Sequence, residues 1–143
     1  MIEIKAARWE DCGQVAALIE QLEEMPIDKA RFEAVYRANL SNPQIDYRTA
    51  WINGVLAGFL SVHIQNLLHH TSAIAEIEEL VVDARYRGQG VGKCLFDQAK
   101  KIAAQAGCPQ LECACNQRRT ASHEFYKRQG MACRHYKFTL PLK

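Results

Sequence analysis

The sequence lacks several features that would place it in a specialised class of protein. It has no run of about 18 apolar residues, which excludes a membrane-spanning helix of ordinary length. Its formal net charge is only +2 and most of its Lys and Arg residues are scattered, so the composition does not indicate nucleic acid binding. The N-terminal residues Met1–Lys5 lack the apolar core of a signal peptide, and we therefore expect a cytoplasmic protein.

The six cysteines do not form a recognisable disulfide or zinc framework. No Cys-x-x-Cys pair occurs, and the only close pair, Cys113 and Cys115, would share one face of a strand. We therefore expect mostly buried thiols in a reducing compartment rather than a cysteine metal site.

The remaining composition is that of an ordinary globular protein, with 48% apolar and 24% charged residues. A chain of 143 residues is long enough to bury one hydrophobic core, and no repeat, linker or low-complexity segment divides it. We therefore predict a single domain over residues 1–143.

The most informative segment runs from residue 80 to residue 93. It begins with an apolar, β-branched run typical of a buried strand and ends where an amphipathic helix is expected to start. Between the two lies a basic, glycine-rich turn with the sequence Arg87-Gly88-Gln89-Gly90-Val91-Gly92-Lys93. Glycines allow positive φ and let backbone N–H groups approach an anion, and the helix N-terminus adds partial positive charge. The segment therefore predicts a site for the phosphates of a nucleotide-like ligand.

The spacing of this turn excludes two common phosphate-binding loops. A P-loop needs four residues before its Gly-Lys-Ser/Thr, whereas three separate Gly88 from Gly92, and Cys94 stands at the hydroxyl position. A dinucleotide fingerprint needs a glycine where this chain has Lys93.

Two segments resemble the GNAT acetyltransferase superfamily. Arg87-x-x-Gly90-x-Gly92 is similar to the loop with which these enzymes bind coenzyme A, and residues 116–131 resemble the family's asparagine followed by a short helix carrying Phe-Tyr. The resemblance covers nearly the whole chain and implies acetyl-CoA as cofactor. Residues 63–70, 76–82 and 136–139 more narrowly resemble the aminoalkylphosphonate N-acetyltransferases.

The apolar periodicity predicts the element order β-α-α-β-β-β-α-β-α-β. Strands are expected over residues 2–7, 47–52, 55–65, 72–82, 111–115 and 134–140, and helices after Asp11, after Asp28, over 91–106 and from about residue 120. Asn53-Gly54 favours a two-residue hairpin. With the resemblance, this order implies an α/β (α+β) GNAT fold. We expect a mixed, strongly twisted sheet of about six to seven strands with helices on both faces.

The resemblance also implies which residues bind acetyl-CoA. Phosphate contacts are expected from Arg87, Gly88, Gln89, Gly90, Val91, Gly92 and Lys93. A bulge around Leu80, Val81 and Val82 would free backbone N–H groups for the pantetheine arm and the acetyl carbonyl. Asn116 and Arg119 are expected to bind the cofactor too, although Asn116 is equally typical of a turn at a strand end.

Acetyl transfer to an amine requires a base for the ammonium and an acid for the leaving thiolate. Glu76 matches the family's glutamate base and would act directly or through water, and Tyr126 matches its tyrosine acid. Strand alternation places Glu76 and Glu78 on one face and Glu79 on the other, where some of these carboxylates would simply be solvated. Tyr126 could instead be a core aromatic.

The acceptor is the part of the function that the sequence leaves most open. His63, His69, His70 and Glu78 are the candidate substrate-binding residues, and the histidines or a divalent metal would balance the charge of a phosphonate. A solvated loop is the alternative for His69 and His70. The leading hypothesis is a small-molecule N-acetyltransferase acting on an aminoalkylphosphonate. The alternatives are a polyamine, aminoglycoside or protein-lysine acetyltransferase, or a non-catalytic CoA-binding module, and a homodimer stays open.

Overall fold

The computed structural model describes residues 1–143, and the chain divides into two compact units, Met1–Glu112 and Cys113–Lys143. The second unit contains helix α4 (Thr120–Arg128) and an extended C-terminal segment. The single domain over the whole chain therefore stays a prediction.

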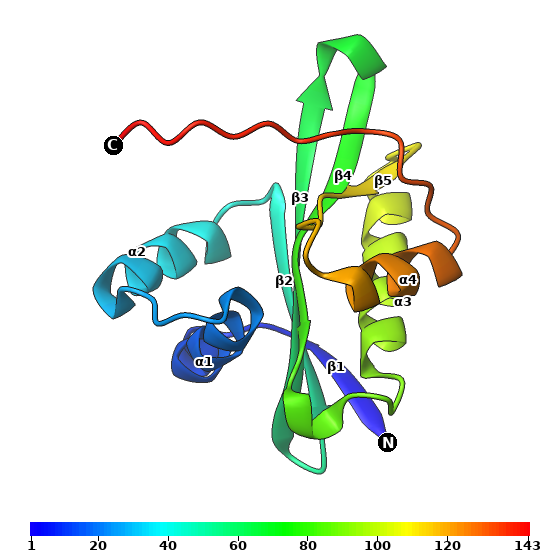
Figure 1. Ribbon diagram of the computed structural model, residues 1–143. Helices are drawn as coiled ribbons and strands as arrows, with labels where there is room; N and C mark the ends of the chain where they lie inside the picture. Colours follow the sequence, from blue (N-terminus) through cyan, green and yellow to red (C-terminus); the bar gives the residue numbers. More distant parts are fainter. The chain divides into compact units, whose positions relative to one another are not determined.

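The fold is a mixed sheet of five strands in the order β1-β2-β3-β4-β5. The strands are β1 (Ile2–Ala6), β2 (Ile45–Ile52), β3 (Val55–Leu67), β4 (Ser72–Val82) and β5 (Leu111–Cys113). The first four form an antiparallel meander. Helices α1 (Cys12–Glu23) and α2 (Lys29–Leu40) lie on one side of the sheet and α3 (Val91–Gln105) on the other (Figure 1). The predicted fold class, with helices on both faces, is confirmed.

Local signals explain several of the boundaries. Asn53 and Gly54 both have positive φ, 49° and 78°, as the tight turn between β2 and β3 requires. Asp28 caps α2, because its carboxylate accepts the Arg31 N–H at 3.0 Å. Asp11 precedes α1 but caps nothing with its side chain; it accepts the N–H of Arg8 at 2.9 Å instead.

Each face of the sheet has its own core. On the α1 and α2 side, the buried cluster consists of Cys12, Val15, Leu18, Tyr36, Leu56, Phe59 and Val81. On the other side, α3 packs so closely that a Cβ on Gly58 would lie 3.0 Å from side-chain atoms of both Leu95 and Val91. Glycine at this position is therefore a condition for the close contact between α3 and β3.

The number of strands differs from the expected six to seven because the last predicted strand is not formed. Residues 134–140 are extended but have no neighbouring strand, and a strand exists only through hydrogen bonds to another. The fifth strand also ends at Cys113 rather than at Cys115.

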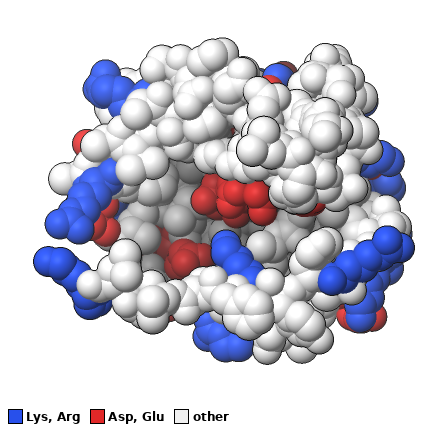
Figure 2. All heavy atoms as spheres, turned by 90° about the horizontal axis from the view of Figure 1, so that it is seen from above, with Lys and Arg blue, Asp and Glu red and all other residues white.

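Neither the helices nor the face of the molecule shown in Figure 2 has the features of a membrane-spanning helix or of one broad basic surface. No helix is both long and apolar enough to cross a membrane. On the face shown in Figure 2, Lys and Arg side chains form separate groups rather than one continuous basic surface.

Candidate active site

An extra residue in β4 governs the geometry of the candidate site. Ser61 of β3 pairs with Glu79, while the next residue, Val62, pairs with Ile77, so Glu78 is the additional residue of a β-bulge. The Ser61 hydroxyl accepts the Glu79 N–H at 3.0 Å and donates to the Glu79 carboxylate. The bulge expected around residues 80–82 thus lies two residues earlier. The side chain of one serine makes hydrogen bonds to both the backbone and the side chain of Glu79.

The bulge changes which carboxylates share a face. Glu79 lies opposite Ser61 and Glu76 lies opposite His63, and cross-strand partners point to the same side of a sheet. Ser61 and His63 are two residues apart on β3, so Glu76 and Glu79 are on one face, which is the side of α1 and α2. The prediction that Glu76 shares a face with exposed Glu78 and not with Glu79 is wrong, because simple alternation assumes an unbroken strand.

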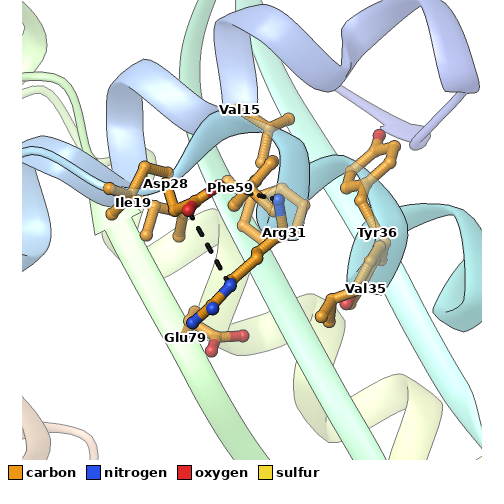
Figure 3. A pocket seen from close by; sticks show the side chains of 11 residues that line it. Val15, Ile19, Asp28, Arg31, Val35, Tyr36, Phe59 and Glu79 are labelled. Carbon is orange, nitrogen blue, oxygen red and sulfur yellow. Dashed lines mark hydrogen bonds and ion pairs between the residues drawn. The ribbon is translucent and has the colours of Figure 1, made fainter.

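A pocket of about 310 Å³ lies on this face of the sheet (Figure 3). Most of its lining is apolar or aromatic, including Val15, Ile19, Phe32, Tyr36, Tyr47 and Phe59. The charged lining residues are Glu79, Asp28 and Arg31. Small-molecule sites typically combine such apolar walls with a few polar groups, so this pocket is the candidate site for the acceptor.

Glu79 is the candidate site residue that simple alternation missed. Burial raises the pKa of its carboxyl group, while the hydrogen bond from Ser61 and the nearby His63 act in the opposite direction. A half-buried carboxylate in a cavity, with its pKa raised by desolvation, is a typical candidate for a ligand-binding or catalytic group. The available signal was an acidic side chain directly before the apolar run Leu80-Val81-Val82.

The second charged group of the pocket comes from α2. Arg31 is exposed and its Nε lies 3.8 Å from Oδ2 of Asp28, and in Figure 3 its guanidinium extends toward Glu79. No ion pair joins Arg31 to Glu79. The pocket therefore presents a carboxylate at the sheet and a guanidinium on its exposed side.

The edge of β4 next to Glu79 offers backbone donors. The N–H of Glu79 points to Ser61 and that of Asp83 donates to Ala57 O at 2.8 Å, so both face β3. Because successive N–H groups point to opposite edges, those of Leu80 and Val82 face away from β3 and that of Val81 faces it. Strand β5 adjoins β4 near Ala75 and is only three residues long, so it does not cover this edge.

The predicted phosphate loop has the expected backbone conformation. Gly88 and Gly90 have φ of 78° and 87°, and Gly90 is the N-cap of α3. The first turn of the helix leaves the N–H groups of Val91, Gly92 and Lys93 outside its hydrogen-bond ladder. These donors at a helix N-terminus form the kind of anion site that the sequence predicts.

The side chains around this loop have partners of their own. Arg87 Nε donates to Val82 O at 3.3 Å, and Lys93 Nζ lies 3.1 Å from Asp97 Oδ2. Gln89 is exposed.

Three predicted site residues belong to the second unit. The side-chain oxygen of Asn116 accepts the Arg118 N–H at 2.9 Å, so Asn116 shapes the turn before α4. Burial and then the charge and hydrogen bond of Cys113 raise the pKa of the Tyr126 phenol, while Arg119 acts in the opposite direction. Tyr126 therefore keeps its proton throughout the physiological pH range.

The structure does not bring the predicted histidines together. His69 and His70 lie in the turn after β3, and the nearer of them is six residues, or about 20 Å along an extended chain, from His63. Nε2 of His70 is 3.4 Å from Glu112 Oε2, whereas His63 lies opposite Glu76 in the register of β3 and β4. No group of three or more His, Cys, Asp or Glu side chains is arranged to hold a metal ion, so these residues do not fit a divalent metal.

Comparison with known proteins identifies a family and several relatives. The model of the acetyltransferase (GNAT) family matches residues 8–131. The chain is 40% identical over 140 residues to the aminoalkylphosphonate N-acetyltransferase of Salmonella typhimurium, covering 98% of this chain and 91% of that protein.

Solved structures share the fold at lower identity. A transcriptional regulator from Bacillus halodurans superposes with a TM-score of 0.92 at 19% identity, covering 99% of this chain and 100% of that one. The aminoglycoside N-acetyltransferase AAC(6')-Iy, solved in complex with CoA, superposes with a TM-score of 0.88 at 18% identity, covering 100% of this chain and 96% of that one.

Replacing Ser61 by alanine tests the link between the bulge and the Glu79 carboxylate. The change removes the hydrogen bond that opposes desolvation, so the pKa of Glu79 should rise further, as measured by NMR titration. Because the folded state then binds this proton more tightly than the unfolded state, the free energy of unfolding falls as pH rises between the two pKa values.

The Ser61→Ala variant should therefore lose more stability at pH 7 than at pH 4. The control is Ser41→Ala, since the exposed Ser41 hydroxyl donates only to Ala38 O. An unchanged Glu79 titration in folded Ser61→Ala would contradict the assignment.

Proposed function

The chain belongs to the acetyltransferase (GNAT) family and is an N-acetyltransferase, and from that premise we propose that its acceptor is an aminoalkylphosphonate. One observation carries the proposal: the pocket contains the carboxylate of Glu79 and the guanidinium of Arg31. An aminoalkylphosphonate carries an ammonium group and an anionic phosphonate a few bonds apart. Glu79 would bind the ammonium, and Arg31, a planar donor suited to phosphonate oxygens, would bind the other end.

The identity to the Salmonella protein supports this choice of substrate class, because it extends over nearly the whole chain. Arg31, rather than a metal ion or His69 and His70, would bind the negatively charged phosphonate group. His63 would act beside Glu76, its partner across the strands.

Acetyl-CoA is the acetyl donor of the family. We propose that its phosphates contact the backbone of residues 88–93, with Arg87 and Lys93 exchanging their present partners for phosphate oxygens. The outward N–H groups of Leu80 and Val82 would bind the pantetheine arm and the thioester carbonyl. Asn116 and Arg119 are the proposed cofactor contacts of the second unit.

The reaction needs a base for the ammonium, donors for the developing oxyanion and an acid for the thiolate, and we assign each role to a named group. Glu79 holds the ammonium, and Glu76, on the same face, accepts one of its protons directly or through water so that the nitrogen can attack the thioester carbon. The N–H groups at the β4 edge donate to the carbonyl oxygen as negative charge develops. When the carbon–sulfur bond breaks, Tyr126 donates its proton to the departing thiolate and is reprotonated by the excess proton on nitrogen, directly or through water, while Glu76 releases its proton to solvent.

A substrate panel tests the acceptor. Thiol release from acetyl-CoA should be robust with aminomethyl- or aminoethylphosphonate and weak with alkylamines of equal length. Arg31→Gln should raise KM for the phosphonate about tenfold or more, the loss of one charge-assisted contact, and leave kcat and the KM for acetyl-CoA nearly unchanged. The control is Arg37→Gln, since the Arg37 guanidinium lies over the Trp9 ring, 4.1 Å from its centroid, and does not line the pocket.

The panel also contains the competing substrate class. Spermidine and an aminoglycoside are included, because Glu79 and Asp28 would also suit a polycation. Rapid acetylation of spermidine without any phosphonate turnover would discard the phosphonate assignment, while family membership would stand.

The proposed roles of the acidic groups and the tyrosine differ in their kinetic signatures. Tyr126→Phe should lower kcat by about 10²-fold with little change in cofactor affinity. Glu76→Gln should also lower kcat, most strongly at low pH where more of the amine is protonated. Glu79→Gln should chiefly raise KM for the amine.

The pH dependence adds a second readout for Glu79. Because burial raises its pKa, its negative charge, and with it the affinity for the ammonium, should be lost at a higher pH than for an ordinary glutamate as pH falls. Glu124→Gln, on the surface of α4 beside Lys127, is the control. Wild-type kcat in both Tyr126→Phe and Glu76→Gln would show that the roles are misplaced.

A further inference from the structure

The pocket contains one side-chain donor that has no role in the proposed reaction, the hydroxyl of Tyr47. Its oxygen accepts a hydrogen bond from Nδ2 of Asn39 at 2.6 Å. A phenol that accepts in this way still has its own proton to donate, and no group of the protein accepts that proton. Tyr36, the other tyrosine of the pocket, differs because its hydroxyl already donates to Arg8 O at 2.7 Å.

Two kinds of contact fix the position of the Tyr47 hydroxyl. The ring of Tyr47 lies between two other aromatic rings, with centroid distances of 5.4 Å to Tyr36 and 5.2 Å to Phe59. Asn39, in the last turn of α2, then holds the oxygen at the end of the ring. A donor that is already held in place loses little conformational entropy when a ligand binds to it.

Tyr47 also shares its face of the sheet with the carboxylate of the pocket. It pairs with Ser61 across β2 and β3, and Ser61 pairs with Glu79 across β3 and β4, so the three side chains form one row. Burial raises the pKa of the Tyr47 phenol, the hydrogen bond from Asn39 opposes that rise, and the charge of Glu79 adds to it. Tyr47 therefore remains protonated, and able to donate, at neutral pH.

Helix α2 connects this hydroxyl to the guanidinium of the pocket. Arg31, Val35 and Asn39 are spaced four residues apart and therefore share one face of the helix. Arg31 and Val35 line the pocket, and Asn39 contacts Tyr47. One helix face thus supplies a charged donor near its beginning and positions a neutral donor near its end.

Two separate donors suit a phosphonate better than a carboxylate. A guanidinium binds both oxygens of a planar carboxylate as a bidentate pair. A phosphonate is tetrahedral and has three oxygens, so the same bidentate contact leaves a third oxygen that points in another direction. A donor on a different element, such as the hydroxyl of Tyr47 on β2, can bind that oxygen and so distinguish the two acid groups.

On the basis of the proposed function, we propose that Tyr47 is a specificity-determining residue whose hydroxyl donates to a phosphonate oxygen that Arg31 leaves free. Asn39 is its positioning residue, because it acts on the substrate only through the Tyr47 hydroxyl. The enzyme therefore prefers an aminoalkylphosphonate to the aminoalkyl carboxylate of the same chain length.

A matched pair of amines tests this preference, since 2-aminoethylphosphonate and β-alanine differ only in the acid group. Tyr47→Phe removes the hydroxyl and keeps the ring. It should lower the ratio of kcat/KM for the phosphonate to kcat/KM for β-alanine about tenfold, the loss of one hydrogen bond to a charged group. The change should lie in KM for the phosphonate, with kcat and the KM for acetyl-CoA nearly unchanged. Tyr136→Phe, which removes an exposed hydroxyl outside the pocket, is the control.

A second variant tests the role of Asn39. Asn39→Leu keeps the approximate size of the side chain and removes the donor, so it should lower the same ratio, but by less than Tyr47→Phe does. In the Tyr47→Phe background it should lower the ratio no further, because the hydroxyl through which Asn39 acts is absent. Circular dichroism checks that each variant is folded.

The outcomes separate this role from the acceptor assignment itself. If the wild-type enzyme acetylates the phosphonate and folded Tyr47→Phe keeps the wild-type ratio, the role of Tyr47 is wrong and the proposed function stands. A further loss when Asn39→Leu is added to Tyr47→Phe would contradict the positioning role. If the wild-type enzyme does not acetylate the phosphonate, the proposed function fails, and the role of Tyr47 fails with it.

Discussion

The extra residue in β4 is the constraint on which the rest of the site depends. Without it, the carboxylates of Glu76 and Glu79 would point to opposite faces of the sheet. With it, both carboxylates lie on the side of α1 and α2, where Glu79 lines the pocket, and the neighbouring N–H groups of Leu80 and Val82 point away from β3. One bulge thus sets the carboxylate proposed to bind the acceptor beside the donors proposed for the thioester, and bulges near active sites commonly redirect side chains in this way.

This arrangement has an energetic cost that the surrounding structure must offset. The half-buried carboxylate of Glu79 loses hydration, which raises its pKa. The hydrogen bond from the Ser61 hydroxyl compensates only part of this desolvation. The compensation comes from the apolar clusters on both faces of the sheet, where Phe59 and Val81 on one side and Leu95 on the other are almost completely buried. The site is therefore a small destabilising feature held in place by an ordinary core, as is typical of functional sites.

Local features of the chain could be predicted from the sequence, and features that depend on pairing could not. The glycines of the phosphate loop and the Asn53-Gly54 turn have the predicted backbone because positive φ is decided by the residue itself. The bulge depends on the register of β4 against β3, which places Ser61 opposite Glu79, and no single-strand pattern contains that information. Arg31 was missed for a related reason: an arginine on an exposed helix is unremarkable until the fold sets it across a cavity from a carboxylate. The final strand was expected because apolar and polar residues alternate over residues 134–140. Such alternation does not show which other strand would supply the hydrogen bonds that a strand requires.

The most direct test of the central claim is amide hydrogen exchange at β4, measured by NMR with and without coenzyme A. In the free protein, the N–H groups of Leu80 and Val82 should exchange much faster than those of Val81 and Asp83, which face β3. Coenzyme A at saturation should slow Leu80 and Val82 by about tenfold or more and leave Val81 and Asp83 nearly unchanged. Equal protection of all four groups in the free protein, or no added protection of Leu80 and Val82 by bound coenzyme A, would contradict the account.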